Sequence, residues 1–285
     1  MSIEATMKFF VRLRRAMLSD TVSAVAAVVL VLILLISIFG PFLPIGKPDQ
    51  IGFGPRLGGW SWSAPMGTDQ LGRSVLARVL QGIRVTFVLS TVSVAIAGLA
   101  GALVGISATY FHRLADEVAS RTADIMFAFP PILLGFLVVA IFRPGVTSAM
   151  AVIALITFPT MLRVVRASTL SVMRRDFMLV AEISGVSFVD RIFRHLLPNV
   201  ANVIVVQTIY SISLGMLIES SLSFLGLGVQ PPAASLGSLL RDGATYLEIA
   251  PWLSVGPGII LALSIMSINL VGDATRSFVD PTYRF

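Results

Sequence analysis

Long stretches without a charged side chain alternate with short polar segments along this chain. Six of the stretches are long enough to cross about 30 Å of hydrocarbon as a helix. Backbone N–H and C=O groups cannot stay unpaired in hydrocarbon, so each stretch predicts a helix rather than a loop. The predicted spans are residues 21–46, 85–111, 125–142, 144–162, 200–218 and 249–272. The pattern therefore predicts an all-α polytopic membrane protein with six transmembrane helices.

The composition agrees with a chain that lies in a bilayer. Hydrophobic residues make up 56% of the 285 positions and charged residues only 13%, whereas soluble domains carry about 25% charged residues. The net charge is +6, but Lys and Arg occur in short clusters between apolar runs. This distribution indicates charge bias toward cytoplasmic loops and the lipid bilayer, and no nucleic acid as a partner. The chain has no cysteine, which excludes disulfides, thiolate nucleophiles and Cys metal sites.

Basic residues near the spans predict how the chain is oriented. The first span is too long for a signal peptide and no Ala-x-Ala site follows it, so we expect a retained anchor. Four basic residues precede it, namely Lys8, Arg12, Arg14 and Arg15. They place residues 1–20 in the cytoplasm, and six spans return the C-terminus, with Arg276 and Arg284, to the same side. Cytoplasmic loops normally carry the excess of Lys and Arg. The first external loop departs from this rule, because it also carries Lys47, Arg56, Arg73, Arg78 and Arg84.

We expect one transmembrane domain over residues 21–285. On the predicted topology, residues 47–84 and 219–248 form external loops, and residues 163–199 form a cytoplasmic segment. Within the second span Ala97, Gly101 and Gly105 recur every four residues, a spacing that lets another helix approach closely. Pro130, Pro131 and Pro159 interrupt later spans, where neighbouring helices must satisfy the freed carbonyls.

The cytoplasmic segment contains a patterned stretch, RRDFMLVAEISGVSFVDRIFRHLLPN, over residues 174–199. It predicts two short helices. Gly185 ends the first, because glycine adopts the left-handed cap conformation at the least steric cost. Ser187 caps the second together with Asp190, and Pro198 marks entry into the fifth span. Such an elbow suits either a stiff lever for a soluble partner or an amphipathic device lying on the lipid surface.

Four separated blocks of the sequence, in the order in which they occur along the chain, resemble the C-type permeases of dipeptide, oligopeptide, glutathione and nickel importers. The elbow is similar to the cytoplasmic "EAA" loop of ABC importer permeases through Gly185, His195, Leu197, Pro198 and Asn199. The other blocks are MGTDQLGRSVLARVLQGIRV at 66–85, SLSFLGLGVQPP at 221–232 and NLVGDATRSFVDP at 269–281. The resemblance covers nearly the whole chain from about residue 65 and implies the type I ABC importer permease fold.

The loop departs from the family pattern at one point. Leu179 and Val180 occupy the acidic and first alanine positions, and Glu182 is displaced by three residues. The resemblance assigns ATPase coupling to the elbow as a whole. The coupling residues expected from it are Leu179, Val180, Ala181, Glu182, Gly185, Val186, Ser187, Asp190, Arg194, His195, Pro198 and Asn199.

The resemblance also implies the partners. It predicts a homologous second permease, two P-loop ATPase subunits that hold ATP and magnesium, and an extracytoplasmic substrate-binding protein. This chain itself has no Gly-x-x-x-x-Gly-Lys-Ser/Thr loop, so we expect no cofactor in it and no enzymatic activity. The implied function is import of peptides across the bacterial inner membrane by alternating access, with nickel or glutathione as the alternative cargo.

Polar residues near the external end are candidates for the pathway or for contact with the binding protein. They are Asp69, Arg73, Glu219, Ser220, Ser221, Gln230 and Arg241, with Trp60 and Trp62 suited to aromatic contact or interfacial anchoring.

Two other functions remain as alternatives. A secondary transporter usually places ionisable groups at mid-membrane, whereas Asp124, Glu219 and Asp273 fall at the ends of the predicted spans. An intramembrane enzyme or metal site needs clustered catalytic or ligating residues. The two histidines, His112 and His195, lie in separate cytoplasmic connections, so no metal site is expected.

Overall fold

The computed structural model describes residues 21–43, 45–111 and 113–279. The predicted basic cluster at Lys8, Arg12, Arg14 and Arg15, and also His112 and Arg284, lie outside these residues. The described chain is helical, and its only β feature is an isolated bridge between Thr68 and Ser74. The elements are α2 (Thr21–Phe39), η1 (Gly40–Phe42), α3 (Val75–Phe111), α4 (Arg113–Phe127), α5 (Pro131–Phe142), α6 (Val146–Met173), α7 (Asp176–Ile183), α8 (Phe188–Asp190), η2 (Arg191–Leu196), α9 (Leu197–Phe224), α10 (Leu236–Ala244) and α11 (Trp252–Val279).

Five helices of the described chain are long and apolar enough to cross a membrane, and a bent pair of helices brings the number to six when the pair is counted as one span. The pair is α4 and α5, whose axes differ by 91°. The interruption predicted at Pro130 and Pro131 is therefore confirmed, but the span predicted over 125–142 is sharply bent and its first arm begins earlier, at Arg113. The chain breaks before Pro130 and Pro131, because a proline disfavours helical geometry in the residue before it and cannot donate a backbone hydrogen bond.

The charged helix α4 is fixed to α6 by two ion pairs. Arg166 donates to both carboxylate oxygens of Asp116, at 2.5 and 2.6 Å. Arg163 donates to Asp124 Oδ1 at 2.7 Å and also lies over the ring of Phe127. The pairs engage two of the five charged side chains of α4, and the other three, Arg113, Glu117 and Arg121, are exposed.

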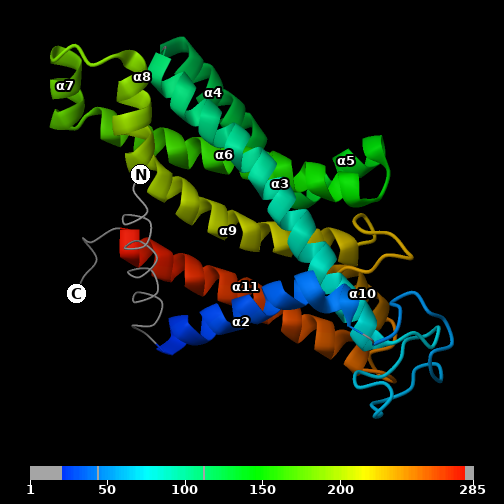
Figure 1. The fold of residues 1–285 in the computed structure, drawn as a ribbon. Helices are drawn as coiled ribbons and strands as arrows, with labels where there is room; N and C mark the ends of the chain where they lie inside the picture. Colours follow the sequence, from blue (N-terminus) through cyan, green and yellow to red (C-terminus); the bar gives the residue numbers. More distant parts are fainter. Residues whose placement is uncertain (1–20, 44, 112, 280–285) are drawn as a thin grey trace.

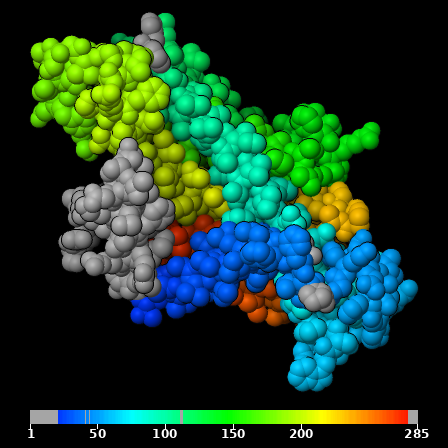
Figure 2. All heavy atoms as spheres, viewed as in Figure 1, coloured from blue at the N-terminus to red at the C-terminus, as the bar shows by residue number. Residues whose placement is uncertain are grey.

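The two ends of the bundle carry different structures (Figure 1). The start of α2, the end of α11 and the α7–α8 segment lie at one end, whereas α10, α5 and the segment between α2 and α3 lie at the other. In the space-filling view that segment forms a lobe far from α7 (Figure 2). The arrangement agrees with the predicted alternation of the spans.

The close approach predicted from Ala97, Gly101 and Gly105 occurs between α3 and α6. A Cβ atom added to Gly101 would lie 2.6 Å from the Phe158 carbonyl oxygen, and one added to Gly105 would lie 2.9 Å from that of Leu162. No side chain fits at either glycine, so the two backbones pack directly against each other.

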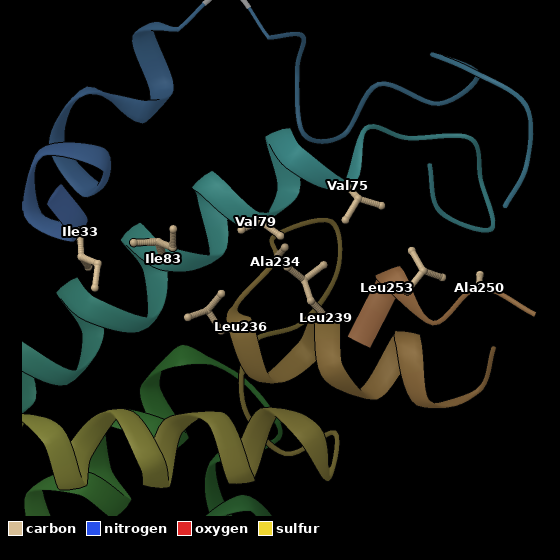
Figure 3. Packing of buried hydrophobic residues seen from close by; sticks show 9 residues of the cluster. All are labelled: Ile33, Val75, Val79, Ile83, Ala234, Leu236, Leu239, Ala250 and Leu253. Atoms are coloured by element: carbon tan, nitrogen blue, oxygen red, sulfur yellow. The ribbon is translucent and has the colours of Figure 1, made fainter. Parts of the chain in front are cut away.

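One apolar cluster holds α10 inside the bundle (Figure 3). Its buried side chains come from α2, α3, α10, α11 and the segments just before α10 and α11, and they are Ile33, Val75, Val79, Ile83, Ala234, Leu236, Leu239, Ala250 and Leu253. Because four elements contribute to it, α10 is a packed part of the body rather than a free loop.

Candidate functional site

The cytoplasmic elbow forms as the sequence predicts at its turn. α7 ends at Ile183, and Gly185 has a φ of +71°. The N–H of Val186 donates to the carbonyl of Ala181 at 3.0 Å, and the N–H of Gly185 donates to that of Glu182 at 3.1 Å. These bonds satisfy carbonyls that the end of the helix would otherwise leave unpaired. The left-handed glycine cap is therefore confirmed.

The second arm begins as predicted but does not end as predicted. The Ser187 hydroxyl accepts from the Asp190 N–H at 3.2 Å and donates to Asp190 Oδ2 at 2.8 Å. However, the helix continues through Pro198 as one element over Phe188–Phe224. The prediction of a separate short helix is thus wrong, whereas Pro198 does lie in the first turn of α9, where the sequence places the entry into the span. Proline has no N–H and crowds the preceding turn, and here the turn before Pro198 is the π-helix η2, over Arg191–Leu196.

The two arms are joined by contacts between their side chains. Glu182 Oε1 of α7 lies 3.0 Å from Arg191 Nη1. Met178 and Ala181 are buried on the inner side of α7, and Leu196 is fully buried in the second arm. The rings of Phe177 and His195 are 6.5 Å apart. The elbow is therefore a single unit attached directly to the spanning helix α9.

The expected coupling residues occupy different places in this unit. Leu179 and Val180 are exposed and Ala181 is buried. Arg194 pairs with Asp190 at 3.0 Å, and the Asn199 amide donates to the carbonyl of His195 at 2.6 Å. Four residues that join the two arms were not among the predicted site residues, namely Phe177, Met178, Arg191 and Leu196. Arg191 could have been identified from the sequence, because its charge is opposite to that of Glu182 on the other predicted arm.

Glu219 is fully buried at the junction of α9, α3 and α10. It lies within α9, since that helix extends six residues beyond the predicted end of the span. The Thr86 hydroxyl donates to Oε2 at 2.8 Å and the Ser223 hydroxyl donates to Oε1 at 2.6 Å. Thr86 Oγ1 also accepts from the Leu236 N–H at 3.1 Å, at the start of α10. No ion pair of Glu219 is recorded among the described residues.

Of the two serines predicted beside Glu219, one contacts its carboxylate and the other does not. Ser220 lies 3.4 Å from its Oε2. Ser221 instead donates to the carbonyl of Leu217. The sequence missed Thr86 and Ser223 as partners, although the position of Ser223, one helical turn after Glu219, was a usable signal.

Asp69 and Arg73 face inward rather than outward. Their exposed fractions are 5% and 7%. Asp69 Oδ2 accepts from Arg73 Nε at 2.6 Å and from Arg78 Nη1 at 3.1 Å. Arg78 also lies 3.5 Å from Asp242 of α10. The cluster ties the external segment to α3 and α10, so two residues expected at an external contact surface are buried in this chain.

The remaining external candidates lie nearer the surface. Arg241 is half-buried beside Asp242, at 3.6 Å. The Gln230 amide donates to the carbonyls of Gly226 and Gly228 and closes the turn after α9. Trp60 and Trp62 form an edge-to-face pair with ring centroids 5.3 Å apart. Their exposure, 64% and 90%, makes them the most accessible aromatic pair of the external segment.

The part of the chain that the structure describes contains no group of three or more His, Asp or Glu side chains that could hold a metal ion.

Comparison with known proteins identifies similar chains. The model of the family described as "Binding-protein-dependent transport system inner membrane component" matches residues 97–285. A dipeptide transport system permease protein, DppC of Alkalihalophilus pseudofirmus, is 32% identical over 92% of this chain and 86% of that relative. The di/tripeptide permease DppC of Pseudomonas aeruginosa is 36% identical over 76% and 71%. The glutathione transport system permease GsiD of Pectobacterium atrosepticum is 34% identical over 82% and 76%.

A solved structure shares the fold. A chain of the MetNI methionine ABC transporter, in an inward-facing conformation, superposes with a TM-score of 0.57 at 17% identity. The match covers 71% of this chain and 96% of that chain. The expected ABC importer permease fold is therefore confirmed.

Proposed function

We propose a specific role for this chain, which belongs to the family of binding-protein-dependent transport system inner membrane components: it passes peptides through the bacterial inner membrane by alternating access. The membership is carried by the family match over residues 97–285 and by relatives at 32 to 36% identity. The observation that supports the mechanism is the elbow at residues 176–199, fixed to α9 without a flexible link.

The energy comes from partners in this proposal. Two P-loop ATPase subunits, which carry ATP and magnesium, bind the elbows of this chain and of a second, homologous permease. Because α8, η2 and α9 are one continuous helix, no flexible loop separates the second arm of the elbow from α9. A displacement of the elbow by the ATPases therefore moves the far end of α9 as well. The whole segment thus acts as a lever that changes the bundle between inward-open and outward-open states.

The proposed orientation places the elbow, residues 1–20 and the C-terminus in the cytoplasm. The opposite end, with residues 47–84 and 219–248, then faces the extracytoplasmic binding protein. Trp60, Trp62, Gln230 and Arg241 are the accessible groups for that contact. The buried Asp69 and Arg73 act instead by fixing the shape of the external segment.

Peptide is the proposed cargo because the two DppC relatives are named for dipeptides and tripeptides. Glutathione is the second candidate, favoured by the similarity to a glutathione permease. Both are short peptides, so one pathway chemistry serves either cargo. Nickel remains the weaker alternative.

The test begins with purification of the tagged chain from its native cell and identification of the proteins bound to it by mass spectrometry. We expect a second permease and P-loop ATPases. In proteoliposomes with the binding protein, labelled dipeptide and labelled glutathione should then accumulate only with ATP. A chain that purifies alone and exchanges solute without ATP would overturn the proposal in favour of a secondary transporter.

A further inference from the structure

Glu219 is a carboxylic side chain held inside the bundle by hydroxyl groups. Its exposed fraction is 0%, and the ion pairs recorded in the part of the chain that the structure describes do not include it. Oε2 accepts from the Thr86 hydroxyl and Oε1 from the Ser223 hydroxyl, at 2.8 and 2.6 Å. A buried polar group costs free energy unless it is hydrogen-bonded, so these two hydroxyls stabilise the buried carboxylate.

A backbone N–H fixes the direction in which each hydroxyl donates. Thr86 Oγ1 accepts from the Leu236 N–H at 3.1 Å, and Ser223 Oγ accepts from the Val229 N–H at 3.0 Å. A hydroxyl has a single proton, and in both cases this proton is donated to the Glu219 carboxylate. The side chain at this position therefore accepts at both of its terminal atoms. A carboxylate can do so, whereas an amide has one acceptor oxygen and an NH2 group that only donates.

The two chains of hydrogen bonds that meet at Glu219 begin in different elements. Thr86 belongs to α3 and Leu236 is the first residue of α10, so the first chain joins α9 to both of these helices. The second begins in the turn that follows α9. α10 also packs directly on α9, because a Cβ atom added to Gly237 would collide with the backbone of Ser220. In Figure 3, Leu236 lies at the start of α10 beside α3. Glu219 is thus the point where α3, α9 and α10 are joined.

α9 connects this point to the elbow. The helix runs without a break from Phe188 to Phe224, so the elbow lies at one end of it and Glu219 near the other. At 1.5 Å per residue, the stretch from Leu197 to Glu219 is about 33 Å long. Packed helices can slide past one another by small amounts, whereas hydrogen bonds require a narrow range of distances and angles. The hydrogen bonds of Glu219 therefore fix α9 against α3 and α10.

Resting on the function proposed above, we propose that Glu219 is a positioning residue that transmits the movement of α9 to α3 and α10. The external ends of these three helices then move as one body with the elbow during the transport cycle. Opening of the pathway toward the binding protein separates this body from the second permease and does not separate α10 from α9. The carboxylate acts through the Thr86 and Ser223 hydroxyls, without contact with the cargo.

Distances between two spin labels test whether the helices move together. The chain has no cysteine, so Asn202→Cys on α9 and Ala244→Cys at the end of α10 provide one exposed label on each helix. The sample is the complex in nanodiscs, with cysteine-free partner subunits, measured with and without a non-hydrolysable ATP analogue. We expect the distance between the labels to change by less than about 2 Å, the size of a small helix shift. A larger change would overturn the proposal. The distance from Ala244→Cys to a label on the second permease is the positive control, and it should change by more than this amount.

Variants at Glu219 test the role of the carboxylate itself. Glu219→Gln keeps the size of the side chain but has only one acceptor, so one of the two hydroxyls loses its partner. We expect the peptide taken up per ATP hydrolysed to fall about tenfold, as for loss of a hydrogen bond to a charged group. The half-saturating concentration of loaded binding protein should stay unchanged, because Glu219 is not at the surface. Glu219→Asp restores a carboxylate and should recover part of the uptake. Thr208→Val is the control, since it removes a hydroxyl that donates within α9, to the carbonyl of Ile204.

The outcomes separate this proposal from the function on which it rests. If uptake depends on ATP and Glu219→Gln is coupled as well as the unmodified chain, the role of the carboxylate is wrong and the importer stands. Equal losses in Glu219→Gln and Thr208→Val would indicate a general packing effect and would overturn the role as well. If Glu219→Gln does not assemble, the label distances with Glu219 in place decide the question. Uptake without ATP by the unmodified chain would overturn the proposed function itself.

Discussion

Glu182 and Arg191 face each other across the elbow, with Oε1 and Nη1 3.0 Å apart, and so connect α7 to the helix that becomes α9. The two residues lie on opposite sides of the turn at Gly185, so their attraction resists opening of the angle between the two arms. Glu182 is well exposed, which limits the energy of the pair. Its importance lies in the geometry of the elbow rather than in the stability of the whole fold.

We expect the single variants Glu182→Ala and Arg191→Ala each to lower ATP-dependent peptide uptake and the exchanged pair Glu182→Arg with Arg191→Glu to restore part of it. The coupling energy from a double-mutant cycle should be about 0.2–1 kcal/mol, as for other exposed pairs. Uptake that falls equally in the single and exchanged variants would show that the pair does not act as a unit.

Gly185→Val should uncouple ATP hydrolysis from uptake. The φ of +71° places a β-branched residue in the left-handed region, at a cost of roughly 1–2 kcal/mol. No atom lies within 4 Å of an added Cβ, so the effect comes from the backbone alone. Gly185→Asn is the matched control, because asparagine tolerates this conformation. Parallel ATPase and uptake assays measure the difference, and equal uptake by both variants would contradict it.

Gly101→Val should prevent stable assembly of the bundle. Its Cβ would lie 2.6 Å from the Phe158 carbonyl oxygen, and that backbone atom cannot turn aside as a side chain can. At Gly98 the nearest atom is the terminal methyl of Met161, at 3.3 Å, so Gly98→Ala is the control. We expect the midpoint temperature of thermal unfolding in detergent to fall markedly for Gly101→Val and to change little for Gly98→Ala. A similar midpoint for both variants would disprove direct backbone packing there.

Removal of the Asp69 carboxylate should loosen the external segment. Asp69→Ala leaves Arg73 and Arg78 buried with fewer partners, and loss of one member of a buried ionic group costs about 3–5 kcal/mol. The more exposed Arg56→Ala is the control. Limited proteolysis of residues 47–74 should accelerate in Asp69→Ala. An unchanged cleavage rate would mean that the apolar cluster alone holds the segment.

Thr86→Val should destabilise the junction of α3, α9 and α10 more than Thr86→Ser does. Valine keeps the shape but removes both the donor to Glu219 and the acceptor for the Leu236 N–H. An unsatisfied buried polar group costs about 1–3 kcal/mol. Hydrogen exchange of the first turn of α10 measures the effect, and equal protection in the two variants would count against the role assigned to this hydroxyl.

The sequence by itself determined the features that depend on local chemistry. Uncharged runs gave the spans because hydrocarbon requires paired backbone groups. Gly185 and Ser187 gave the turn and the cap of the elbow, because each acts on the backbone within a few residues. The small residues Gly101 and Gly105 likewise indicated a close helix approach, although not which helix they meet.

Only the tertiary structure decided features that depend on distant partners. Asp69 and Arg73 look like surface residues in the sequence, but Arg78 and Asp242 complete their charges in the interior. Pro198 marks the first turn of α9 as its sequence position predicts, but only the structure shows that η2 joins α9 to α8 without a break. The outward direction of Leu179 and Ile183 follows from which side of α7 packs on the bundle. Each of these outcomes is set by contacts between segments that lie apart in the chain, and such contacts leave no periodic pattern to read.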